Sequence, residues 1–240
     1  MHLPRDIYMS RKTEFDNGNE LMSQTRSLKP RIWKTGDGAP PEVIFEATGV
    51  LRQGGLLIYP TETFYALGAV PAHGAVERIF GLKGRDFTKA LPLIASSRKA
   101  VLSVVSGWSE TAEKLARDFW PGPLTLILPA NSSLPSILHA GTGKVAVRIS
   151  PHPVASRLAE SAGGLLVSTS ANKAGQPPAN DPATICGEVL CGVDGFVDAG
   201  NLAGGFPSTI VDVTVQPPKT IRVGRIRWEE IRGSLAGISD

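Results

Sequence analysis

Short apolar runs alternate with segments of helical periodicity along most of this chain, and this alternation constrains the fold more than any other feature of the sequence. The predicted strands span residues 56–59, 91–94, 124–128, 145–149, 165–168, 195–198, 208–214 and 219–223. The predicted helices span residues 43–51, 73–82, 97–105, 109–119, 153–161 and 181–190, and a last helix begins near residue 228. Such alternation is typical of an α/β fold, and the late strands without intervening helices indicate a mixed sheet.

The first 41 residues have a different character from the rest of the chain. They are polar and mixed in charge, and a run rich in Gly and Pro at residues 36–41 closes them. We therefore predict an N-terminal extension over residues 1–41, with one short strand around Ile32 and Trp33, and an α/β domain over residues 42–240. Hydrophobic residues make up 42% of the 240 residues, which suits a globular protein with a sizeable core.

Composition excludes several classes of protein. No apolar run approaches the roughly 20 residues that a membrane span needs, and the N-terminus lacks a signal-peptide core, so the sequence predicts a cytoplasmic protein without a membrane partner. Cys186 and Cys191 carry no metal-ligand pattern, and we expect them to be free, buried thiols in one helix. The four histidines are scattered, so we predict no metal site. The net charge of +3 permits an anionic substrate or an RNA partner but requires neither.

A basic segment at residues 83–89 is the first candidate for chemistry. Lys83, Arg85 and Lys89 place three cations within seven residues. Arginine offers a planar fork of donors and lysine a mobile point charge, which together suit a phosphate or carboxylate ligand. The alternative is a basic turn that faces water, as charge runs usually do.

Hydroxyl and amide side chains follow two of the predicted strands. Thr61 and Thr63 come after the strand at 56–59, residues 168–172 read Ser-Thr-Ser-Ala-Asn at the end of another, and Arg148 lies in a third. Ligands of open α/β sheets bind beyond the strand ends, so these groups are candidates to line a polar pocket. Turns and helix caps, which favour the same residue types, are the alternative.

Standard catalytic loops are absent from the sequence. The run from Gly141 to Lys144 resembles the end of a phosphate-binding loop, but it lacks the upstream glycine and the Ser or Thr after the lysine. We predict a turn there, with Lys144 available as an anion contact. No Gly-x-Ser-x-Gly motif is present, so the residue types favour positioning and charge stabilisation over a covalent nucleophile.

Seven motifs, in order along the chain, resemble the YrdC-like family, the L-threonylcarbamoyladenylate synthases, over residues 42–232. The motifs are Pro60-Thr-Glu-Thr-Phe-Tyr-Ala-Leu-Gly68, Lys83-x-Arg85-x-x-x-Lys89, Trp120-Pro-Gly-Pro-Leu-Thr125, Val145-Ala-Val-Arg-Ile149 with Pro151-His152-Pro153, Ser168-Thr-Ser-Ala-Asn172, Ser208-Thr-Ile-Val-Asp212 and Arg222-Val-Gly224. The resemblance is to the short, single-domain type. It implies a twisted, open mixed sheet with flanking helices and a concave basic cavity.

The resemblance also implies a reaction, in which L-threonine, bicarbonate and ATP give threonylcarbamoyl-AMP and pyrophosphate. The product would serve the threonylcarbamoyl transferase machinery that modifies adenosine 37 of tRNA. ATP would carry Mg²⁺ on its phosphates, because no carboxylate cage for a metal is evident. By match to the family, the catalytic residues are Lys83, Arg85 and Lys89, the threonine side is Thr63, Arg148, Ser168 and Ser208, and the nucleotide side is Lys83, Arg85, Lys89, Lys144, Ser170, Asn172 and Arg222.

Two departures from the family pattern keep other functions open. Phe64 and Ala66 stand where the family usually has Val and Gly, which would reshape the threonine pocket, and Phe206 and Pro207 stand where it often has Val and Glu. One alternative is a YrdC-like protein that binds double-stranded RNA or tRNA without strong synthase activity. The other is a paralogue that uses a different small substrate.

Overall fold

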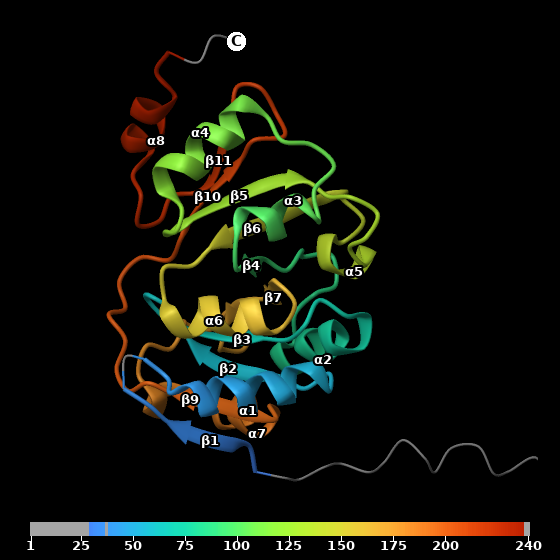
Figure 1. Ribbon diagram of the computed structural model, residues 1–240, viewed down its shortest axis with the longest axis vertical. Coiled ribbons are helices and arrows are strands. Elements are labelled where there is room, and N and C mark those ends of the chain that lie inside the picture. The colour runs from blue at the N-terminus through green and yellow to red at the C-terminus, as the bar shows by residue number, and fades with distance from the viewer. Residues whose placement is uncertain (1–28, 37, 238–240) are drawn as a thin grey trace, which may run out of the picture.

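Residues 29–36 and 38–237 are described by the computed structural model, and their strands divide between two mixed sheets (Figure 1). The strands are β1 (Arg31–Lys34), β2 (Leu57–Pro60), β3 (Tyr65–Gly68), β4 (Leu93–Ala95), β5 (Leu124–Pro129), β6 (Lys144–Ile149), β7 (Leu165–Val167), β8 (Thr169–Ser170), β9 (Gly195–Asp198), β10 (Thr209–Asp212) and β11 (Lys219–Arg222). The predicted α/β fold with mixed strands and flanking helices is confirmed, although the strands form two sheets where a single one was expected.

Both sheets combine parallel and antiparallel pairs. The five-stranded sheet has the order β1-β9-β2-β3-β8, in which β1, β9 and β2 run parallel and β3 is antiparallel to both of its neighbours. The six-stranded sheet has the order β11-β10-β5-β6-β4-β7 and alternates antiparallel with parallel pairing across its width. The mixed character that the sequence predicts is confirmed, but it arises mainly from antiparallel pairs of earlier strands, and among the late strands only β10 and β11 pair antiparallel.

The chain passes from one sheet to the other at Ser168. This single residue separates β7, at the edge of the six-stranded sheet, from β8, at the edge of the five-stranded sheet. The sequence predicts one continuous strand over 165–168. It does not reveal the change of partner, because strand pairing is decided by the neighbouring strands rather than by local propensity.

The helices pack on the outside of the sheets and against each other. They are α1 (Pro41–Arg52), α2 (His73–Lys83), α3 (Arg98–Leu102), α4 (Glu110–Phe119), α5 (Ser136–His139), α6 (Pro153–Ser161), α7 (Gly187–Cys191) and α8 (Trp228–Leu235), with a 3₁₀ turn at Pro182–Thr184. Local signals explain several of their ends: the Ser109 side chain accepts from Ala112 N at the start of α4, and Pro153 opens α6. In Figure 1, α4 lies beside α8 near the C-terminal end, and α1 lies beside α6.

β1 belongs to the five-stranded sheet although its residues fall within the predicted extension. The strand expected around Ile32 and Trp33 is confirmed, and it pairs in parallel with β9. The Trp33 side chain is only 8% exposed and packs in the same cluster as Ile44 and Leu51 of α1. Residues 1–28 of the predicted extension lie outside the described residues.

Three local predictions differ from the structure. The helix expected at 181–190 is interrupted: Asp181 caps the short 3₁₀ turn as predicted, but the chain is extended at Ile185 and Cys186 before α7 begins. Cys186 and Cys191 are exposed free thiols, not buried ones, because α7 turns only Val189 fully into the core. The loop expected after Pro60 spans only residues 61–64, and β3 returns beside β2 as a hairpin.

Thr48 of α1 provides a stability test. It is 3% exposed, and its Oγ1 finds no hydrogen-bond partner among the described residues. A buried hydroxyl without a partner costs about 1–3 kcal/mol, and valine has nearly the same shape. We therefore expect Thr48→Val to raise the free energy of unfolding by about 1 kcal/mol in urea denaturation.

Thr209 supplies the matched control for that experiment. This buried hydroxyl donates to the Ile226 carbonyl oxygen at 2.6 Å and accepts from the Gly224 and Ile226 amides at 3.0 Å. Thr209→Val should therefore lower the free energy of unfolding. A loss of stability in both variants would contradict the interpretation of Thr48.

Candidate functional site

Lys83 closes α2, and its ammonium group lies inside the protein. Only 3% of the residue is exposed. Its Nζ donates to the backbone oxygens of Ser170 at 2.5 Å and Asn172 at 2.6 Å, and to Asn172 Oδ1 at 3.0 Å. Ser170 Oγ donates to the same Asn172 Oδ1 at 2.5 Å. The structure thus joins three predicted site residues in one network that occupies all three donors of the ammonium group.

The environment of Lys83 acts on its charge in two directions. Burial lowers the pKa of the Lys83 ammonium from its usual 10.5 to about 8, and the nearby charge of Arg85 adds to the decrease. The three oxygen acceptors favour the charged form. Lys83 is therefore a cation held by hydrogen bonds in a site that would otherwise exclude it.

Arg85 and Lys89 lie on the loop that follows α2. Gly84 ends the helix in the left-handed region with φ of 59°, and the chain turns there. Arg85 Nη2 donates to the Ala90 carbonyl oxygen at 2.9 Å, and its Nε reaches the Lys89 carbonyl oxygen at 3.3 Å. The Lys89 side chain is exposed. Part of the basic segment is thus built into the protein, and part faces outward.

A buried ion pair joins Arg148 to Glu62. Arg148 Nη1 donates to Glu62 Oε1, and the two side chains are only 12% and 15% exposed. Ser150 Oγ donates to the other carboxylate oxygen, Glu62 Oε2, at 2.9 Å. Arg148 belongs to β6 of the six-stranded sheet, whereas Glu62 lies between β2 and β3 of the five-stranded sheet. The pair therefore bridges the two sheets.

Tyr59 and Ser168 are neighbours of this ion pair. Burial raises the pKa of the Tyr59 phenol, and the Glu62 charge adds to the increase, while a hydrogen bond with Ser168 and the charge of Arg148 oppose it. Tyr59 also donates to the Val167 carbonyl oxygen at 3.4 Å. Ser168 and Arg148, both predicted on the threonine side, thus share one environment.

Arg222 and Ser208 form the next group. Arg222 Nη2 donates to the Ser208 carbonyl oxygen at 2.8 Å and to Ser208 Oγ at 3.1 Å, and Ser208 Oγ lies 2.9 Å from Thr125 Oγ1. Burial lowers the pKa of the Arg222 guanidinium, and the charge of Arg148 adds to the decrease. The like charges of these two guanidinium groups, on β6 and β11, therefore act on each other.

Thr63 and Lys144 make contacts of their own. Thr63 is 5% exposed, and its carbonyl oxygen accepts from Gly204 N at 2.9 Å, which ties the 61–64 turn to the connection between β9 and β10. Lys144 Nζ donates to Asp212 Oδ2 at 3.0 Å. Lys144 and Arg148 lie on the same face of β6, about 13 Å apart along the strand. The structure thus places Lys144 near the start of β6, well away from the Glu62–Arg148 pair.

Glu62 and Tyr59 are the residues that sequence reasoning missed. Tyr59 precedes the run Pro60-Thr61-Glu62-Thr63, and Glu62 lies within it. The sequence predicts a role for the threonines of this run but none for its carboxylate. A carboxylate within a motif otherwise made of hydroxyl groups, in a chain with candidate arginines, is the signal that could have found Glu62. Phe64 is half-buried, and Ala66 lies in β3 opposite Ser170.

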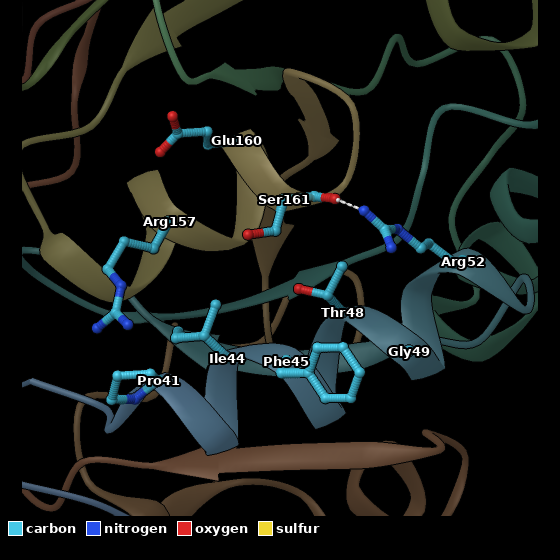
Figure 2. Close-up of a pocket in the computed structure, with 9 residues that line it drawn as sticks. All are labelled: Pro41, Ile44, Phe45, Thr48, Gly49, Arg52, Arg157, Glu160 and Ser161. Carbon is cyan, nitrogen blue, oxygen red and sulfur yellow. Dashed lines mark hydrogen bonds between the residues drawn. The ribbon is translucent and has the colours of Figure 1, made fainter.

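Three surface cavities of the described residues lie elsewhere, and none is lined by a predicted site residue. One of about 390 Å³ lies between α1 and α6, as Figure 2 shows, with Arg52 bound to the Ser161 carbonyl oxygen at 2.7 Å. Within residues 29–36 and 38–237, no group of three or more His, Cys, Asp or Glu side chains could hold a metal ion. In the same residues, no helix combines the length and apolar character needed to cross a membrane.

Comparison with known proteins decides the family. Residues 49–224 match the model of the Sua5/YciO/YrdC family, which is described as telomere recombination. The chain belongs to this family. All eleven predicted site residues, from Thr63 to Arg222, lie within the matched stretch.

Curated members of the Sua5/YciO/YrdC family similar to this chain are named threonylcarbamoyl-AMP synthases. The protein of Pyrococcus abyssi is 36% identical over 80% of this chain and 57% of its own length. That of Thiobacillus denitrificans is 40% identical over 68% of this chain and 87% of its own length. The chain therefore spans little more than half of the Pyrococcus relative but most of the Thiobacillus one.

Solved structures of the family share the fold. Sua5 of P. abyssi complexed with L-threonine superposes with a TM-score of 0.82 at 33% identity, covering 85% of this chain and 61% of that one. YciO of E. coli gives a TM-score of 0.75 at 26% identity, covering 82% of this chain and 96% of that one. The two-sheet arrangement is thus the architecture of the family.

Proposed function

We propose that this chain is a threonylcarbamoyl-AMP synthase, which condenses L-threonine, bicarbonate and ATP into threonylcarbamoyl-AMP and pyrophosphate. The observation that carries the proposal is its 36–40% identity to curated proteins of that name, one of which it covers over 87% of the length. The complex of the Pyrococcus relative with L-threonine supports threonine as the amino acid. In reaction class the protein is a nucleotidyltransferase, because an adenylyl group moves from ATP to a carbamate.

The chemistry needs charge stabilisation more than a nucleophile. The threonine amine and bicarbonate form a carbamate with loss of water, and a carbamate oxygen then attacks the α-phosphorus of ATP as pyrophosphate leaves. Every reactant carries negative charge, so fixed cations and hydrogen-bond donors lower the barrier. ATP arrives as its Mg²⁺ complex, and the metal keeps phosphate oxygens and water as ligands, since the described residues offer no carboxylate cluster.

Arg148 suits the threonine side, and Arg222, which we assign to the nucleotide, lies next to it. Arg148 and Arg222 approach each other with Glu62 as the neighbouring carboxylate, which leaves one net positive charge. A carboxylate of threonine or of the carbamate would compensate that charge. Ser208 Oγ accepts from Arg222, and Ser168 hydrogen-bonds Tyr59, whose pKa also responds to the Arg148 charge, which supports assigning both hydroxyl groups to the same ligand.

The network of Lys83 suits the nucleotide side. Lys83 fixes the turn at Ser170 and Asn172, whose side chains we assign to the nucleotide. Because all three donors of Lys83 are occupied, a direct contact with a phosphate would require the exchange of one protein oxygen for a phosphate oxygen. Arg85 and the exposed Lys89 lie on the adjoining loop and are assigned to the triphosphate. Lys144, paired with Asp212, is the nucleotide-side residue most distant from Arg148 along β6.

The proposal is tested by pyrophosphate release from MgATP. We expect release that requires both L-threonine and bicarbonate, with threonylcarbamoyl-AMP identified by mass spectrometry. Serine and other small amino acids should be run in parallel, because Phe64 and Ala66 differ from the usual family residues. Release with another amino acid alone would identify a paralogue with a different substrate, and no release with any of them would contradict a synthase.

The setting of the reaction follows from its product. We place the protein in the cytoplasm, where the product would pass to the transferase machinery that modifies adenosine 37 of tRNA. Binding of double-stranded RNA or tRNA without chemistry is the competing function. It would appear as RNA binding that weakens steeply with salt in a protein that releases no pyrophosphate.

A further inference from the structure

We propose that Glu62 is the positioning residue of the threonine side: it fixes the Arg148 guanidinium so that its remaining donors face the substrate carboxylate. This inference rests on the proposed function. Glu62 itself is not placed on the substrate. Its effect is exerted through Arg148.

The contacts of Glu62 account for both of its carboxylate oxygens. Oε1 accepts from Arg148 Nη1, and Oε2 accepts from Ser150 Oγ at 2.9 Å. Ser150 is 2% exposed, and its hydroxyl also accepts from His152 N at 3.2 Å, so this second anchor is itself held in place. A carboxylate with a hydrogen bond to each oxygen cannot rotate freely, and the guanidinium bound to it is fixed as well.

The charges around Arg148 require such a partner. Arg222 lies near enough for its pKa to be lowered by the Arg148 charge. Without Glu62, the buried Arg148 guanidinium would lose its counter-charge beside the like charge of Arg222, and it would turn away. With Glu62 in place, one of the five donors of Arg148 is committed to the carboxylate, and the others remain for a ligand.

The position of Glu62 couples two parts of the site. Glu62 lies in the turn between β2 and β3 of the five-stranded sheet. Arg148 lies in β6 of the six-stranded sheet, and Ser150 comes directly after the end of that strand. A shift between the sheets would move Thr63 relative to Arg148. The Glu62 contacts oppose that shift and therefore fix the two threonine-side residues relative to each other.

Glu62→Gln is the decisive variant, because it keeps the size of the side chain and removes its charge. L-threonine binding is measured by titration calorimetry, and the KM for ATP by pyrophosphate release. We expect the Kd for threonine to rise about tenfold or more, as for the loss of a charged hydrogen bond, with the KM for ATP within twofold of the original. Ser150→Ala, which removes only the second anchor, should give a smaller rise in the same Kd.

Glu113→Gln is the matched control. Glu113 Oε2 likewise accepts from an arginine, Arg98, and from a second donor, Trp108 Nε1 at 2.6 Å, but it lies on α4 away from the site. We expect the Kd of the Glu113→Gln variant for threonine to equal that of the unmodified protein. An equal Kd in Glu62→Gln would overturn the inference.

A double-mutant cycle separates positioning from direct binding. If Glu62 acts through Arg148, then adding Glu62→Gln to Arg148→Ala should change the threonine Kd no further. Effects that multiply would overturn the inference, since Glu62 would then act independently. An unmodified protein that binds no threonine would refute the proposed function and the inference together, whereas normal threonine binding with an unaffected Glu62→Gln refutes the inference alone.

Discussion

Lys83→Met should reduce kcat/KM for pyrophosphate release by at least about a thousandfold and lower the free energy of unfolding by about 3 kcal/mol. Methionine matches the length of the lysine stem but donates no hydrogen bond. The substitution would leave the Ser170 and Asn172 backbone oxygens and Asn172 Oδ1 without their shared donor in a buried site. An unsatisfied buried polar group costs about 1–3 kcal/mol, and removal of one partner from a buried charged network costs more. The turn assigned to the nucleotide would lose its anchor at the same time.

The pH dependence of the Lys83 network follows from its pKa. Burial lowers that pKa from 10.5 to about 8, so between pH 8 and 10.5 the unfolded chain binds the proton more tightly than the folded one. Stability contributed by this group therefore rises with pH across that window. Activity should fall as pH rises through about 8, because the neutral amine has two donors for three acceptors. A pH profile of kcat/KM and urea denaturation at several pH values measure the two trends.

Lys99→Met provides the comparison for Lys83→Met. Lys99 lies on the exposed side of α3 and is not among the predicted site residues. The Lys99→Met variant should have the activity, the stability and the pH profile of the unmodified protein. Full activity of Lys83→Met would show that the network is dispensable and would contradict the role assigned to it.

Gly224→Ala should lower the free energy of unfolding by about 3 kcal/mol and reduce activity at least tenfold. A methyl group at Gly224 would lie 2.2 Å from the Pro207 carbonyl oxygen and 2.6 Å from the Ser208 carbonyl carbon. These atoms belong to the backbone, so the segment itself must move, and such overpacking typically costs about 1–3 kcal/mol. Displacement of Ser208, which we assign to the threonine side, would break its contacts with Arg222.

Gly81→Ala tests whether that effect is specific to the close contact. Gly81 lies in α2 with nothing within 4 Å of the added methyl group. Alanine is favoured over glycine inside a helix by about 0.5–1 kcal/mol, so this variant should be slightly more stable and fully active. Thermal unfolding and pyrophosphate release, measured on both variants, test whether the close contact at Gly224 causes the losses of stability and activity. Equal behaviour of the two would show that Gly224 is not needed for close packing.

Most elements could be predicted because their signals are local. α6 has the predicted bounds, since Pro153 fixes its start and the apolar residues recur at helical spacing up to Ser161. β5 and β6 follow from apolar runs set off by turn residues. Periodicity could not predict the interruption of the helix at Ile185. A buried apolar residue at this position fits the pattern of a helix and that of an extended segment equally well.

The sequence motifs by themselves determined the family and the residues that we assign to the site. The chemistry needs particular side chains at particular spacings, and the runs around Thr63, Lys83, Arg148 and Ser168 carry that information locally. Tertiary structure alone decided how those side chains are used. Ion pairing and burial depend on which strands become neighbours, so only the fold shows that Lys83 is enclosed by oxygen acceptors and that Glu62 holds Arg148 across the two sheets.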